Sequence, residues 1–87
     1  MITKSYKTKG TCSREIELSI DDNGIIQDVK FVGGCSGNTQ GVSALVKGRK
    51  AADVANILRG IKCGDKATSC PDQLASALDE LVAEKNL

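Results

Sequence analysis

The first third of the chain alternates polar and apolar residues, which is typical of strands that bury one face. The run 15–21 predicts one strand, and the run 25–32 predicts a second strand returning beside it. Asn23-Gly24 lies between them and predicts a tight hairpin turn in which both central residues take positive φ. Residues 2–8 form a weaker strand candidate. The apolar positions expected on the buried face are Ile16, Leu18 and Ile20, followed by Ile25, Val29 and Phe31.

The rest of the chain has apolar residues at helical spacing. A short helix is predicted from Asn38 or Thr39 to Val46, and a second over 51–58. A last helix is predicted from about Pro71 to Glu84, with Thr68 or Ser69 near its cap. The buried stripes expected on the second and third helices are Val54, Ile57 and Leu58, then Leu74, Ala77, Leu78, Leu81 and Val82. Strands followed by helices indicate an α+β fold, with a three-stranded antiparallel sheet and about three helices packed on one face. We expect one domain spanning residues 1–87.

Composition limits what such a domain can do. The 87 residues include one Phe, one Tyr and no Trp, so the core has few large side chains and would gain from a metal or a disulfide. The net charge is +1, and no stretch of the sequence is strongly basic, so we expect neither nucleic acid nor a membrane surface as partner. Residues 1–7 contain no apolar run, which predicts a cytoplasmic chain without a secretion signal.

Four cysteines carry the chemistry of the sequence: Cys12, Cys35, Cys63 and Cys70. Each lies in a predicted loop or at the end of a predicted element, beside glycine or proline and outside the apolar stripes. The interpretation as inert buried thiols suits a single cysteine better than four in such settings. In a reducing compartment, cysteines bind metals or carry out redox reactions more often than they form structural disulfides. We therefore predict that the four converge on one metal or redox site.

The chain contains no histidine, so a tetrahedral site would consist of four thiolates or would include a carboxylate such as Asp65 or Asp72. Sulfur ligands favour zinc or an iron–sulfur cluster. Cys70 precedes Pro71 at a predicted helix start, where the helix dipole favours a thiolate. Catalytic sites that depend on histidine are excluded, and we predict no catalytic residue.

The run Thr68-Ser69-Cys70-Pro71-Asp72 spells TSCPD and closely resembles the TSCPD domain. That domain is found at the C-terminus of vitamin-B12-dependent ribonucleotide reductases and as a small stand-alone protein with four cysteines. The length, the cysteines and the run 33–38 resemble the stand-alone form. The resemblance implies an accessory role beside a reductase. We do not expect 87 residues alone to reduce ribonucleotides, because the reaction needs a radical-generating cofactor, a nucleotide pocket and a far larger barrel.

A more distant resemblance is to the NifU/IscU-type iron–sulfur scaffold. It covers the hairpin 20–31, the turn at Gly34-Cys35 and the segment 46–49. The resemblance implies that the three scaffold cysteines correspond to Cys12, Cys35 and Cys70, with Cys63 as an extra ligand. The chain departs from that family at two positions, where Arg14 replaces an acidic residue and Ser69 replaces a histidine.

Three hypotheses follow for the function. The leading one is a zinc-binding or iron–sulfur-binding accessory module in which all four cysteines are ligands, with a ribonucleotide reductase or an iron–sulfur assembly protein as partner. The second is a dithiol redox protein in which Cys63 and Cys70 form a reversible disulfide. The third is a plain protein-interaction domain.

Overall fold

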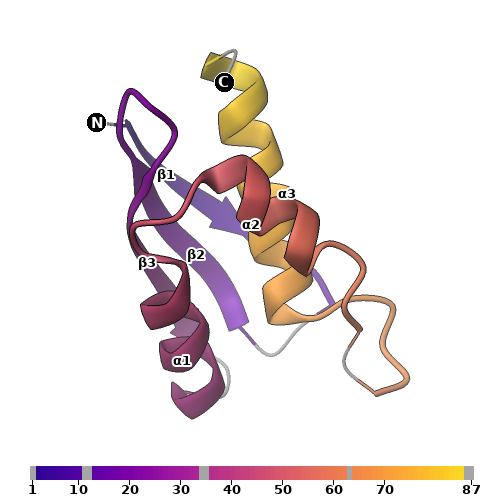
Figure 1. Ribbon diagram of the computed structural model, residues 1–87. Coiled ribbons are helices and arrows are strands. Elements are labelled where there is room, and N and C mark those ends of the chain that lie inside the picture. Colours follow the sequence, from indigo (N-terminus) through magenta and orange to yellow (C-terminus); the bar gives the residue numbers. More distant parts are fainter. Residues whose placement is uncertain (1, 11–12, 34–35, 63, 86–87) are drawn as a thin grey trace.

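The computed structural model describes residues 2–10, 13–33, 36–62 and 64–85. Three strands precede three helices, as predicted (Figure 1). The elements are β1 (Ile2–Lys7), β2 (Ser13–Ile20), β3 (Ile26–Gly33), α1 (Ser36–Val46), α2 (Ala51–Leu58) and α3 (Cys70–Lys85). Within this described part of the chain, no helix is both long enough and apolar enough to cross a membrane.

The strands form one antiparallel sheet in the order β1-β2-β3. Its hairpin turn differs from the predicted one. The Asp21 carbonyl accepts from the Gly24 N–H at 3.0 Å, and the Asp21 N–H donates to the Ile25 carbonyl at 3.0 Å, so the loop has three residues. Gly24 takes a φ of 79°, and the Asp21 carboxylate accepts from the Asn23 and Ile25 N–H groups. The turn is therefore a hydrogen-bonded turn followed by a left-handed glycine, a common three-residue hairpin.

Two predicted core positions are wrong. On β3 the buried residue is Ile26 rather than Ile25, because a register shift between Ser19 and Ile20 changes the face that each following residue presents. On α2, Ile57 is 71% exposed, because the stripe that faces the core runs through Ala51, Val54, Ala55 and Leu58. Ile57 lies to the side of that stripe.

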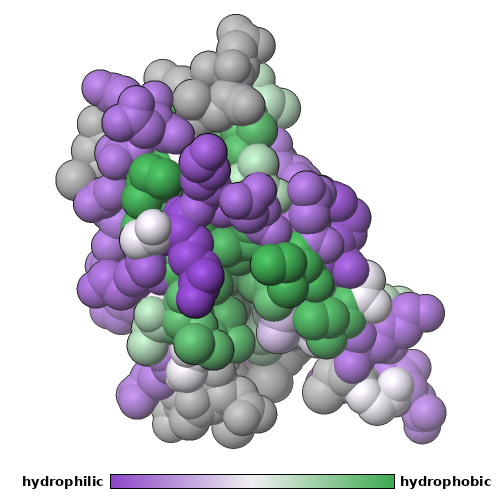
Figure 2. All heavy atoms as spheres, in the orientation of Figure 1, coloured by the Kyte–Doolittle hydropathy of each residue, from purple (hydrophilic) through white to green (hydrophobic). Residues whose placement is uncertain are grey.

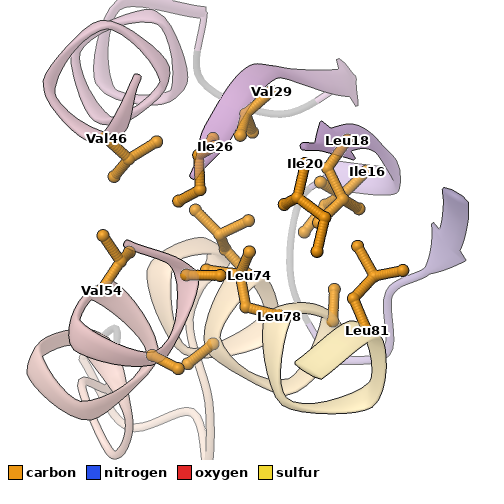
Figure 3. Close-up of a cluster of buried hydrophobic side chains, with 14 residues drawn as sticks. Ile16, Leu18, Ile20, Ile26, Val29, Val46, Val54, Leu74, Leu78 and Leu81 are labelled. Carbon is orange, nitrogen blue, oxygen red and sulfur yellow. The ribbon is translucent and has the colours of Figure 1, made fainter. Parts of the chain in front are cut away.

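The core fills the space between the sheet and the helices (Figure 3). α3 covers the sheet face at β2, α2 packs on α3, and α1 lies against β3. The fully buried large side chains come from two strands, β2 and β3, and from α3: Ile16, Leu18, Ile20, Ile26, Leu74, Leu78 and Leu81. The predicted stripe on α3 is thus confirmed.

β1 alternates half-buried and exposed residues, with Ile2, Lys4 and Tyr6 on the inner side. Lys4 points toward α3, and its Nζ lies 2.7 Å from Glu84 Oε1 and 3.5 Å from Glu80 Oε1. The hydrogen bond to the Glu84 carboxylate is the main reason that the pKa of Lys4 is raised. The first strand is therefore held to the last helix partly by charge.

Candidate functional site

Cys70 is the first residue of α3, and the sequence around it fixes the helix start. The Ser69 Oγ accepts from the Asp72 N–H at 3.1 Å, and the Ser69 carbonyl accepts from the Gln73 N–H at 2.9 Å. These two bonds make Ser69 the N-cap, which confirms the predicted cap region, and Pro71 occupies the first turn. Cys70 is half-buried, so its sulfur is held at a helix N-terminus close to the surface.

The sulfur of Cys70 contacts the beginning of β2. Its Sγ lies 3.1 Å from Ser13 Oγ, within hydrogen-bond distance for sulfur. Ser13 is buried, and in the sheet it is paired with Gly33, the last residue of β3. Three elements therefore meet at this end of the molecule: the start of β2, the end of β3 and the start of α3.

The loop that joins β1 to β2 lies against the start of α3 just before residues 11–12. The Lys9 N–H donates to the Gln73 Oε1 at 3.1 Å. A Cβ on Gly10, whose φ is 77°, would lie only 3.1 Å from Thr68 Cγ2. The Thr8 hydroxyl, before residues 11–12, donates to the carbonyl of Ser13, after them. The close approach at Gly10 explains why a residue without a side chain stands there.

The connection from α2 to α3 is hydrogen-bonded to residues at the start of α3. The Ser69 hydroxyl donates to the Ile61 carbonyl at 2.6 Å. The Asp72 carboxylate accepts from the Gly60 N–H at 2.7 Å and also from the Thr68 hydroxyl. The Thr68 hydrogen bond, followed by the Gly60 one, lowers the pKa of Asp72, so this carboxylate stays ionised at neutral pH.

Of the four predicted ligands, Cys70 is described, and Cys12, Cys35 and Cys63 lie outside the described residues. Among residues 2–10, 13–33, 36–62 and 64–85, no three metal-ligating side chains come together. The predicted carboxylate ligands are placed differently from each other. Asp72 is engaged by Thr68 and Gly60, and Asp65 is exposed in the loop before α3.

Sequence reasoning missed two residues that build this end of the molecule. Ser13 was not predicted to approach Cys70, because that contact depends on how the sheet and α3 pack. Ser69 was predicted near the helix cap but not as the anchor of Ile61. One available signal was the position of both serines, since each is the immediate neighbour of a cysteine.

The fold and this site define a small α+β domain with a cysteine at the first position of its last helix, within hydrogen-bond distance of a buried serine hydroxyl. A model of the TSCPD domain family matches residues 1–82, and the chain belongs to that family. No curated protein and no solved structure matches the chain.

Proposed function

We propose that this TSCPD domain is a metal-binding accessory module in which Cys12, Cys35, Cys63 and Cys70 hold one zinc ion or one iron–sulfur cluster. The observation that carries the proposal is the contact of Cys70 with Ser13. Ser13 begins β2, beside Gly33, the residue at which β3 ends. The role of the metal would be structural, joining chain segments that the apolar core does not reach.

The chain neighbours of the other three cysteines support a shared site. Cys12 immediately precedes Ser13, Cys35 follows Gly33 by two residues, and Cys63 follows Ile61 by two residues. A step of two residues spans at most about 7 Å. Ser13 is within hydrogen-bond distance of Cys70, and Gly33 is paired with Ser13 in the sheet. Ile61 accepts a hydrogen bond from Ser69, the residue before Cys70. The described chain neighbours of these three cysteines therefore lie near the start of α3, which supports a shared site.

The available donors fit a soft metal. The sequence offers sulfur and no imidazole, and thiolates bind zinc and iron–sulfur clusters. The nearest carboxylate on the same helix turn, that of Asp72, already accepts two hydrogen bonds. An all-thiolate ligand set therefore fits this end of the molecule better than a mixed one. The Ser13 hydroxyl would supply a hydrogen bond to the sulfur of Cys70, a common partner for a ligating atom.

The test is to purify the protein without oxygen and to measure zinc, iron and acid-labile sulfide per chain. We expect either one zinc or iron with matching sulfide, and we expect each of the four Cys→Ser variants to lose it. Metal that binds only the folded state adds to stability, so a chelator should lower the melting temperature of the wild type. The chelator should leave the melting temperature of Cys70→Ser unchanged.

A variant in which one cysteine is moved to another position provides the matched control. Ser5 is exposed on β1, so the double variant Cys70→Ser/Ser5→Cys keeps four thiols but moves one out of the site. Metal content should stay low in this variant and normal in Ser5→Cys alone. The proposal fails if the wild type contains neither metal nor sulfide and the chelator does not change its melting temperature.

The dithiol hypothesis predicts a different result for the same preparation. The hydrogen bond from Ser69 to Ile61 favours it, because it ties the residue before Cys70 to a segment two residues from Cys63. Oxidation would convert the two thiols to a disulfide and pass two electrons and two protons to an oxidised thiol partner. Mass spectrometry of a metal-free protein would then show a loss of two hydrogens assigned to this pair.

A ribonucleotide reductase or an iron–sulfur assembly protein remains the proposed partner, and this rests on the sequence resemblance.

A further inference from the structure

A groove between α1 and α2 is open on the surface, away from the start of α3. It is lined by six apolar residues and one arginine: Val42, Leu45, Val46, Arg49, Val54, Ile57 and Leu58. Leu45 is 68% exposed and Ile57 is 71% exposed. Figure 2 shows apolar side chains of α1 and α2 gathered on one face of the molecule, with hydrophilic residues around them. Exposed leucine and isoleucine side chains side by side are typical of interaction surfaces.

The size of the groove suits side chains of another protein. Its volume is about 250 Å³, below the roughly 300–1,000 Å³ of clefts that bury small molecules. α2 has eight residues and is therefore about 12 Å long. A partner helix lying along it would place anchors at positions i, i+4 and i+7 over a similar length. The groove thus matches about two turns of an amphipathic helix.

Charges around the groove are mainly positive. The hollow continues past Val54 and Ile57 toward Lys50 and Asp53. Neither Arg49 nor Lys50 forms an ion pair with a carboxylate among the described residues, and the Arg49 Nε donates to the Leu45 carbonyl at 2.8 Å. An acidic partner would complement this rim.

We propose that the groove between α1 and α2 binds an amphipathic helix of a partner protein, with apolar anchors between Leu45 and Ile57 and acidic residues facing Arg49 and Lys50. A second copy of this chain fits less well. A symmetric dimer brings the same patch onto itself, so the basic rim of one copy would lie against the basic rim of the other. The proposal is independent of the metal site.

The test uses a library of helical peptides of about 16 residues, long enough to form some helix alone. Apolar residues are fixed at i, i+4, i+7 and i+11, and the flanking positions vary among Glu, Lys, Ser and Ala. We expect the selected peptides to be enriched in Glu and to shift the amide signals of α1 and α2 in isotope-labelled protein. Leu45→Glu should weaken their binding by about tenfold or more. Arg49→Glu should move the selection toward Lys.

Matched variants distinguish the groove from a general effect of charge. Ala44 is exposed beside Leu45 but does not line the groove, so Ala44→Glu should leave peptide binding unchanged. Lys30→Glu makes the same charge change as Arg49→Glu on β3 and should not alter the selection. The proposal is overturned if no peptide binds, if binding is insensitive to Leu45→Glu, or if selection shows no preference for Glu. It is also overturned if light scattering finds a dimer that Leu45→Glu dissociates, because the occupant is then a second copy.

Discussion

The apolar core and the end of the domain that carries Cys70 are stabilised in different ways. At the core, large aliphatic side chains of β2, β3 and α3 are fully buried against one another. The second region is the cysteine end, defined here by Ser13, Gly33, Ile61, Ser69 and Cys70. Its contacts are hydrogen bonds made by serine and threonine hydroxyls, and others that the Asp72 carboxylate accepts. The first region is part of the apolar core, whereas the second consists of separate chain segments whose residues lie outside that core. A shared metal ion would add most where packing adds least.

The largest expected effect is in the core. Leu78 is fully buried at the centre of the α3 stripe, so Leu78→Ala leaves a cavity and should lower the free energy of unfolding by about 2–5 kcal/mol. Val82 is only partly buried on the same helix, and Val82→Ala should cost less. Chemical denaturation measures both. Equal losses in the two variants would contradict the view that the core end is stabilised by close packing around α3.

A smaller effect is expected at the cysteine end. Ser69→Ala removes the N-cap of α3 and the hydrogen bond to the Ile61 carbonyl, which should cost about 1–2 kcal/mol. If the metal proposal holds, this variant should also retain less metal, because the segment before Cys63 is released. Ser76→Ala is the control, since Ser76 lies on the same helix and forms one long bond of 3.4 Å to the Asp72 carbonyl. If Ser69→Ala keeps its full metal content and only loses stability, Ser69 caps the helix but does not contribute to the metal site.

The smallest effect concerns the charge between β1 and α3, and it depends on pH. The pKa of Lys4 is raised in the folded protein, so its contribution is fully present below the unfolded value of about 10.4 and is lost as pH rises through the higher folded value. The wild type should therefore lose stability relative to Lys4→Met above about pH 10, and the two should differ little in their pH dependence near neutrality. Thermal melts at increasing pH test this. A parallel pH dependence in the two proteins would show that Lys4 does not contribute through its charge.

Local signals in the sequence predicted the elements well. Alternation at Ile16, Leu18 and Ile20 marked a strand face that is buried, and the combination of Ser69 and Pro71 marked the start of α3. These features depend on residues a few positions apart, so their pattern is visible in the sequence.

Features that depend on distant segments were not predicted. The burial of Ile26 instead of Ile25 follows from a register shift between β2 and β3. The exposure of Ile57 follows from the orientation of α2 on the core, which buries Ala51, Val54 and Ala55 instead. The contact of Ser13 with Cys70 joins residues that are 57 positions apart. The common cysteine site remains a prediction, since three of the cysteines lie outside the described residues. The resemblance to the NifU/IscU-type scaffold also remains a prediction, since no solved structure matches the chain.

The inward direction of Lys4 has a consequence for how this protein behaves at high concentration. β1 is an edge strand of the sheet, and its outer side has no partner strand among the described residues. A strand edge that is open and apolar invites pairing with other molecules, and a lysine in the inner row is one way in which natural proteins prevent it. With Glu80 and Glu84 holding Lys4 between Ile2 and Tyr6, an incoming strand cannot continue an apolar row without burying these charges. The same ion pairs that contribute little to stability therefore act against intermolecular sheet growth.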